Sequence, residues 1–371
     1  MTSNLEPYQD SEVPDVIARL KSDKEFLDFI GRWQSPGLSR WLPFIAEYFV
    51  RRHLDAILQA VNDIRSFQDV VADYVSQLMS ASVTSFNVEG LDKFDPDQAY
   101  LYISNHRDIA GDSMFVNYAR YLQGMGTVHI AVGDNLIQKR FATDIMKLNK
   151  SFFIPRGETN AKKMYQGLKQ ASGYIHRMIG DGQSVWIAQS EGRAKDNVDK
   201  TEPAVVKMLT LFERKKNFSD VINGLNIVPV SLSYEFDPCD GQKARELTLK
   251  RETGSYQKSV GEDLLSLATG LSGYKGEVTL RFGEKLSGNY ESPESVATAL
   301  DQQIVANLEI FEVNRWAAGK LGHSVAALTN PGSVEVYEAR LRECPPPFRD
   351  QWLRQYANPL LNQLGLIEDP E

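Results

Sequence analysis

The sequence has little cysteine and no long hydrophobic run. Only two cysteines, Cys239 and Cys344, occur in 371 residues, which excludes a disulfide scaffold and a four-cysteine zinc site and fits a reducing compartment. The longest stretch without Lys, Arg, Asp or Glu is 74–88. It is shorter than the roughly 20 apolar residues that span a bilayer. Residues 1–15 are polar and acidic, so no secretory signal is expected there.

The chain also lacks an excess of positive charge. It has 41 Lys and Arg against 49 Asp and Glu, a net charge of −8, which argues against a strongly basic nucleic-acid binder. Hydrophobic residues make up 42% and charged residues 24%, a globular composition that is too apolar for general disorder. We therefore expect no nucleic-acid partner.

Common catalytic signatures are absent as well. The sequence has no G-x-S-x-G elbow, no G-x-x-x-x-G-K-[ST] loop and no H-E-x-x-H helix. The five histidines lack the spacing of metal ligands, so no metal is expected. His129 falls inside an expected strand and is interpreted as a packed core residue.

Apolar periodicity predicts three regions. Residues 1–82 are expected to be helical, with a break at Pro36-Gly37, and residues 291–371 are expected to return to helix. Between them, residues 83–290 alternate short apolar runs with helical stretches, which predicts an α/β domain with a mixed, largely parallel sheet flanked by helices. The expected strands are 99–104, 127–132, 151–154, 184–188, 227–233 and 277–282, and the expected helices 112–123, 160–179, 201–218, 291–316 and 334–366, the last interrupted by a turn at 344–347.

Polar residues follow four of the expected strands. Asn105-His106 follows the first, and a histidine near a carboxylate can act as a general base. Asp108 and Asp112 are close in sequence, although either also suits the start of a helix by itself. Because open α/β sheets place their sites at the carboxyl ends of strands, this stretch is a candidate active site.

The other three stretches carry basic, acidic and small residues. F-F-I-P-R-G delivers Arg156, and arginine suits bidentate contact with phosphate. V-W-I-A-Q-S-E-G-R-A-K-D delivers Glu191, Gly192 and Arg193, with Lys195 close behind. I-V-P-V-S-L-S-Y contains Pro229, which is unusual inside a strand. Taken singly, each stretch also fits an ordinary surface loop or strand.

Taken in order, the blocks N-H-x-x-x-x-x-D, F-I-x-R, S-E-G-R and V-P-V resemble the glycerolipid acyltransferase family, which includes glycerol-3-phosphate and lysophosphatidate acyltransferases. The run E-V-T-L-R-F-G-E-K-L at 277–286 is similar to the end of that domain. The resemblance covers about 83–290 and implies the corresponding α/β fold. It also implies an acyl thioester, on coenzyme A or acyl carrier protein, as co-substrate, with no further cofactor.

The resemblance implies that His106 is the general base and that Asn105, which precedes it in the first block, contacts the substrate. The family usually has four residues between the histidine and its aspartate, a position that Gly111 occupies here. Asp112, one residue later, is the favoured partner, and Asp108 remains open.

In the other blocks, the resemblance implies that Arg156 contacts the acceptor phosphate and that Pro229 shapes a substrate pocket. Glu191, Gly192 and Arg193 match an E-G-x-R element that is one residue shorter here, with Lys195 adding positive charge. The shortening leaves the exact acceptor open.

The charge distribution is independent of the resemblance. Residues 150–216 contain 13 Lys and Arg and 7 Asp and Glu, a net of +6, so the rest of the chain carries −14. Such a region attracts phosphorylated substrates. Four of its cations, Lys162, Lys163, Lys169 and Arg177, equally suit the solvated face of a helix.

Residues 31–52 combine Trp33, Trp41, Phe44, Tyr48 and Phe49 with four arginines. This mixture favours either an interfacial membrane helix or a helix docked on the domain, and one helix can do both with opposite faces. We expect a cytoplasmic protein that associates peripherally with the inner face of the membrane.

The sequence thus predicts an O-acyltransferase acting on glycerol 3-phosphate or lysophosphatidate. The shortened E-G-R block allows another acceptor, such as an amino-acid lyso-lipid. The displaced aspartate motivates a second alternative, a non-catalytic protein that binds lipid or acyl carrier protein. A thioester hydrolase is less favoured because no serine or cysteine nucleophile is evident.

Overall fold

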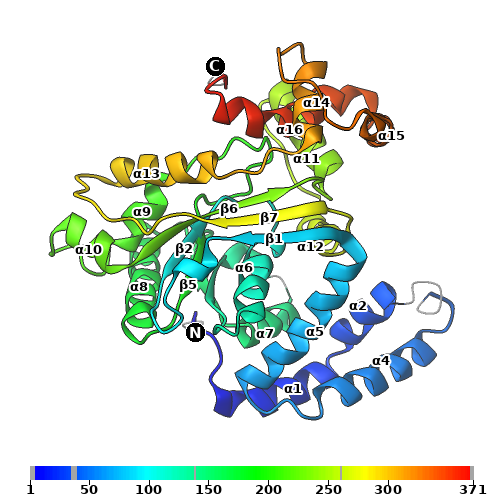
Figure 1. The fold of residues 1–371 in the computed structure, drawn as a ribbon. Coiled ribbons are helices and arrows are strands. Elements are labelled where there is room, and N and C mark those ends of the chain that lie inside the picture. Colours follow the sequence, from blue (N-terminus) through cyan, green and yellow to red (C-terminus); the bar gives the residue numbers. More distant parts are fainter. Residues whose placement is uncertain (1–4, 35–39, 138, 260, 368–371) are drawn as a thin grey trace. The chain divides into compact units, whose positions relative to one another are not determined.

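The computed structural model describes residues 5–34, 40–137, 139–259 and 261–367. They form two compact units, one comprising residues up to 77 with 128–174 and the other 78–127 with 175–371 (Figure 1). Two long helices, α5 (Ile64–Ser82) and α8 (Ala161–Gly180), run from one unit into the other. The region boundaries expected at 82 and 290 lie near changes of secondary structure. Helix gives way to strand at Val83, and the last strand ends at Phe282.

The first unit is mainly helical. Apolar residues at helical spacing, such as Val13, Ile17 and Leu20, are buried together with Phe141 and Leu148 in one core. Its two strands pair in parallel. Its elements are η1 (Asp10–Glu12), α1 (Val13–Ser22), α2 (Lys24–Gln34), α4 (Pro43–Leu58), the first part of α5, β3 (His129–Gly133), η3 (Asp134–Leu136), α7 (Arg140–Leu148), β4 (Ser151–Ile154) and the first part of α8. The break expected at Pro36-Gly37 lies outside the described residues.

A buried carboxylate joins the N-terminal segment of this unit to α7. Arg19 Nε donates to Asp144 Oδ2 at 2.8 Å, and the Tyr8 hydroxyl donates to Asp144 Oδ1 at 2.7 Å. Burial, reinforced by Asp144, raises the pKa of Tyr8 to about 12, so this hydroxyl stays protonated as a donor. Arg19 supplies the opposite charge, and both donors satisfy a carboxylate that would be costly to bury alone.

The second unit contains a five-stranded sheet in the order β1-β7-β6-β2-β5. Neighbouring strands are parallel except β6 and β7, so the expected mixed, largely parallel sheet flanked by helices is confirmed. The strands are β1 (Val83–Glu89), β2 (Leu101–Ser104), β5 (Val185–Ala188), β6 (Ile227–Tyr234) and β7 (Gly276–Phe282). The sequence analysis missed β1, which is polar, lies at the sheet edge and has no fully buried residue.

Two helices expected in this unit are interrupted, and two helices at 240–253 and 262–272 were not expected. The single helix expected over 201–218 is wrong: α9 ends at Leu209, and α10 starts afresh because Asn217 caps it, accepting from Asp220 N. The helix expected over 291–316 is also interrupted, since Asn314 Oδ1 accepts from Phe311 N at the start of α14. The helices are η2 (Leu91–Lys93), α6 (Gly111–Leu122), α9 (Pro203–Leu209), α10 (Phe218–Gly224), α11 (Asp240–Thr253), α12 (Glu262–Ser272), α13 (Pro293–Ala306), α14 (Glu312–Lys320), η4 (Pro331–Ser333), α15 (Val334–Glu343), η5 (Pro346–Phe348) and α16 (Arg349–Gln363).

The C-terminal helices pack around an aromatic core that also includes Phe236, which follows β6. Trp316 of α14, Tyr337 of α15, and Trp352 and Tyr356 of α16 are buried together. Trp352 and Tyr356 stack with ring centroids 4.4 Å apart. In Figure 1 these orange and red helices gather beside α11. They therefore form a layer next to the segment that follows β6.

His129, which is half-buried in the first unit, makes folding depend on pH. Its Nδ1 lies 2.7 Å from the Tyr174 hydroxyl, and burial, with a smaller effect of Lys150, lowers its pKa from 6.5 to about 3. The folded protein keeps the ring neutral while the unfolded chain protonates it, so this stability is lost as pH falls from 6.5 toward 3. His129→Gln removes this protonation. Between pH 7 and pH 5, the unfolding free energy of the variant is expected to fall by about 1–2 kcal/mol less than that of the wild type, measured by urea unfolding.

The exposed His53 supplies the control, because His53→Gln removes an imidazole without changing a buried position. It is expected to keep the pH dependence of the wild type. Equal pH dependence in both variants would show that His129 does not contribute.

Candidate active site

The loop after β2 begins with a side chain that makes the hydrogen bonds of a strand backbone. Asn105 is fully buried, its Nδ2 donates to Leu232 O at 2.9 Å, and its Oδ1 accepts from Leu232 N at 2.8 Å. The amide thereby continues the pairing of β2 with β6 one residue past the strand end. Asn105 thus holds the loop in place rather than presenting its amide to solvent.

His106 and Asp112 form a hydrogen-bonded pair. Nδ1 of His106 lies 2.7 Å from Oδ2 of Asp112, which is the second residue of α6 and is fully buried. An ionised carboxylate can only accept, so Nδ1 carries the proton and Nε2 keeps its lone pair. The ring is half-buried, edge-on to Trp186. This arrangement suits a general base acting through Nε2.

Three further donors hold the Asp112 carboxylate. The backbone N–H groups of Arg107 and Asp108 donate to Oδ2 at 2.7 and 3.0 Å. The hydroxyl of Tyr234 donates to Oδ1 at 2.7 Å. Asp112 also lies in the first turn of α6, where the helix dipole favours negative charge. Its orientation is therefore fixed from several sides.

Asp108 has a different partner set. Its Oδ1 accepts from the backbone N–H groups of Ala110 and Gly111 at 3.0 and 2.7 Å, which shapes the turn before α6. Burial, and then the neighbouring charge of Asp112, raises its pKa. The turn at 109–110 takes up the extra residue of this loop, so Asp112 reaches His106 despite its later position.

Two buried ion pairs fix the rest of the loop. Arg107 Nη2 donates to Asp199 Oδ2 at 2.6 Å, and Lys243 Nζ donates to the carbonyl of Arg107 at 2.7 Å and to the Asp237 carboxylate. Burial raises the pKa of Asp199 to about 6, although Arg107 opposes this shift. The sequence analysis did not single out these four residues, because a charged residue gives no sequence signal that it will be buried with a partner.

The E-G-R loop lies against the His106 loop. Ala194 N donates to the carbonyl of His106 at 2.8 Å, so the first and third sequence blocks are adjacent. Glu191 and Gly192 are exposed, whereas Arg193 is half-buried. Nη1 of Arg193 is buried and has no hydrogen-bond partner among the described residues. An arginine in this state beside a candidate base is suited to receive an anion.

Lys195 and Pro229 lie deeper than the sequence suggested. Lys195 donates to the Glu246 carboxylate of α11, and burial lowers its pKa while Glu246 acts in the opposite direction. Pro229 is buried within β6, beside Ile103 of β2. Both therefore support the sheet and loop around His106.

Arg156 belongs to the first unit. It follows β4, and its backbone N–H donates to Asp134 Oδ1 at 2.9 Å. Its side chain crosses Gly133, where an added Cβ would lie 2.6 Å from Arg156 Nε. Gly133 ends β3, so Arg156 lies at the carboxyl ends of both strands of that unit.

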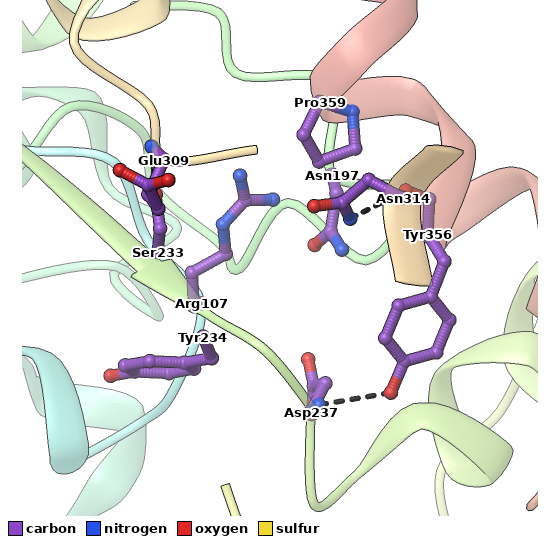
Figure 2. Close-up of a pocket in the computed structure, with 9 residues that line it drawn as sticks. All are labelled: Arg107, Asn197, Ser233, Tyr234, Asp237, Glu309, Asn314, Tyr356 and Pro359. Atoms are coloured by element: carbon purple, nitrogen blue, oxygen red, sulfur yellow. Dashed lines mark hydrogen bonds between the residues drawn. The ribbon is translucent and has the colours of Figure 1, made fainter. Parts of the chain in front are cut away.

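Figure 2 shows a small polar cavity beside the loop, into which the guanidinium of Arg107 points. Its volume of about 20 Å³ suits a water molecule but excludes a glycerol phosphate or a thioester. On its other side Asp237 N donates to the hydroxyl of Tyr356 at 3.0 Å, so α16 touches the segment that holds Lys243. The cavity is lined by Arg107, Asn197, Ser233, Tyr234, Asp237, Glu309, Asn314, Tyr356 and Pro359.

Helix α4 of the first unit has two contrasting faces. Val50, Leu54 and Leu58 are buried in the core of that unit. On the other face Trp41, just before the helix, is 81% exposed and Phe44 is 85% exposed. Leu42, Ile45, Tyr48 and Phe49 are exposed as well. Within the described ranges no helix combines the length and hydropathy needed to cross a membrane.

Comparison with known proteins places residues 85–233 in a match to the family model described as Acyltransferase. All four strand-end blocks lie within these residues, whereas 277–286 lies beyond them. A solved structure of the 1-acyl-sn-glycerophosphate (LPA) acyltransferase of Thermotoga maritima covers 83% of this chain and 100% of its own, at 11% identity and a TM-score of 0.39. No curated protein matches the chain.

The packing of α12 against the His106 loop yields a stability test. A Cβ at Gly270 would lie 1.8 Å from Asp108 Oδ2, so Gly270→Ala must displace the helix or the turn. The expected loss is about 1–3 kcal/mol of unfolding free energy, measured by chemical denaturation. Gly241→Ala in α11 is the control, because no atom lies within 4 Å of its added Cβ. An equal effect of both substitutions would contradict the contact.

Proposed function

We propose that this chain is an O-acyltransferase of glycerolipid synthesis, because residues 85–233 match the Acyltransferase family model and the order of the sequence blocks resembles the glycerolipid acyltransferases. It transfers a fatty acyl group from a thioester, on coenzyme A or acyl carrier protein, to a hydroxyl of glycerol 3-phosphate or lysophosphatidate. The observation that carries the proposal is the His106–Asp112 pair, with Nδ1 and Oδ2 separated by 2.7 Å.

The pair supplies the proton transfers that such a reaction needs. Nε2 of His106 takes the proton of the acceptor hydroxyl as its oxygen attacks the thioester carbonyl, and Asp112 stabilises the imidazolium. When the tetrahedral intermediate collapses, the C–S bond breaks and the thiolate takes the proton from His106. One C–O bond replaces one C–S bond, and the histidine returns to its starting state.

Arg193 is the proposed contact for the phosphate of the acceptor. Its buried, unpartnered Nη1 lies on the loop that donates to the carbonyl of His106, and it belongs to the region with a net charge of +6. Guanidinium groups bind phosphate oxygens through charge-assisted hydrogen bonds. A phosphate contact by Arg156 stays a prediction of the sequence resemblance.

The alternative of a non-catalytic binding protein was motivated by the displaced aspartate. That displacement does not separate the pair, since Asp112 accepts from Nδ1 of His106. The choice of acceptor, including an amino-acid lyso-lipid, is decided by a panel of hydroxylated acceptors in the assay below.

We expect His106→Ala to lower kcat by about 10²–10⁴-fold, because general base catalysis contributes that much to such reactions. The assay measures thiol release from acyl-coenzyme A and acyl carrier protein with each acceptor. His323→Ala removes a histidine outside the site and is expected to retain activity. A fully active His106→Ala protein would contradict the assignment, and turnover by neither carrier with any acceptor would favour the binding protein.

The two aspartates provide a matched pair for the same assay. Asp112→Asn replaces two acceptor oxygens with one and presents an amide donor to groups that already donate, so kcat is expected to fall strongly. Asp108→Asn keeps the oxygen that accepts from Ala110 and Gly111, so most activity is expected to remain. The opposite order of activities would assign the partner role to Asp108.

We further propose that the exposed face of α4 contacts a membrane surface. Its exposed side chains from Trp41 to Phe49 are aromatic and aliphatic, and the exposed Arg40 and Arg52 lie before and after them in the sequence. Apolar residues flanked by cations suit the boundary of an anionic bilayer, where lyso-lipid acceptors and acylated products reside.

The double substitution Trp41→Ser and Phe44→Ser is expected to weaken binding to phosphatidylglycerol vesicles at least about tenfold, because two large apolar side chains no longer enter the interface. Vesicle flotation measures this binding. Leu364→Ser with Leu366→Ser, at an exposed site of the second unit, is the control. Unchanged binding of the α4 variant, or a dimer that buries this face without vesicle binding, would contradict the proposal.

A further inference from the structure

We propose that Tyr234 is a positioning residue for the His106–Asp112 pair and acts through its hydrogen bond to Asp112. The Tyr234 hydroxyl donates to Oδ1 of Asp112 at 2.7 Å, while His106 binds Oδ2 of the same carboxylate. The three side chains thus form a continuous chain of hydrogen bonds. This inference rests on the proposed role of His106 as a base.

The fold fixes Tyr234 independently of Asp112. It is the last residue of β6 and pairs with Val278 of the antiparallel strand β7. Its ring packs edge-on against Phe115 of α6, with centroids 5.5 Å apart. In Figure 2 its hydroxyl is at the end of the ring turned away from Asp237 and Tyr356. The sheet and helix therefore aim this hydroxyl at Asp112 rather than into the polar cavity.

The surrounding charges keep the hydroxyl a donor. Burial raises the pKa of Tyr234 well above its usual 10, and the neighbouring carboxylates Asp112, Asp108 and Asp237 add to the shift. The phenol therefore stays protonated and remains a hydrogen-bond donor. A protonated phenol that faces an ionised carboxylate can act only as the hydrogen-bond donor.

The contact has two consequences for His106. Backbone N–H groups of Arg107 and Asp108 hold Oδ2, and Tyr234 fixes Oδ1, so the carboxylate cannot rotate away from the ring. Tyr234 also withdraws charge from the carboxylate. Without it, Asp112 stabilises the protonated imidazolium more strongly, and the base is neutral only at higher pH.

The test compares Tyr234→Phe with Tyr102→Phe in the full chain. Tyr102 is fully buried, and its hydroxyl accepts from Arg120 Nη1 at 2.7 Å, so its loss is a matched change outside the site. Tyr234→Phe is expected to lower kcat about tenfold with little change in KM, as expected for one hydrogen bond to a charged group. The acid limb of its kcat/KM profile is expected to move up by about half a pH unit.

A second readout does not depend on turnover. Diethylpyrocarbonate acylates only neutral imidazole, so the pH dependence of modification at His106, followed by peptide mass spectrometry, reports on the base directly. Its midpoint is expected to rise in Tyr234→Phe and stay unchanged in Tyr102→Phe. An unchanged midpoint, or equal shifts in both variants, would overturn the positioning role. Absence of turnover in the wild type would count against the proposed function alone.

Discussion

The hydrogen bond between His106 and a fully buried carboxylate is the constraint on which the rest of the site depends. A carboxylate without water is stable only if donors surround it, and Asp112 has backbone donors from the loop and a hydroxyl from β6. Those donors fix the loop, the first turn of α6 and the end of β6 relative to one another. The chemistry proposed at Nε2 thus depends on how the second unit satisfies one buried charge.

The C-terminal helices extend this constraint beyond the acyltransferase domain. Tyr356 and Arg340 both donate to Asp240, and Tyr356 also accepts from Asp237 N. Asp237 in turn pairs with Lys243, which donates to the carbonyl of Arg107. A chain of buried polar contacts therefore runs from α15 and α16 to the residue next to His106. The C-terminal helices thus help to hold the loop that carries His106 in place.

The sequence predicted the strand ends and His106 because period-two apolar runs and the residues after them are local signals. It could not decide between Asp108 and Asp112, since the conformation of one turn determines which carboxylate reaches the ring. Asn105 was assigned to the substrate, yet its amide completes a backbone ladder with Leu232. Tyr234 ends the stretch I-V-P-V-S-L-S-Y, but no local pattern indicates its proposed role, because that role depends on a contact 122 residues away in sequence. The prediction of one helix over 201–218 was wrong because Asn217, inside an otherwise helical pattern, caps a new helix.

The tautomer of His106 tests the central claim most directly. Nitrogen-15 NMR of histidine-labelled protein, with His106→Ala to identify the signals, distinguishes the protonated from the bare nitrogen of each ring. At a pH where the ring is neutral, the hydrogen bond to Asp112 predicts a protonated Nδ1 and a bare Nε2. A bare Nδ1 with a protonated Nε2 would contradict the account, because the nitrogen proposed to accept a proton would already carry one.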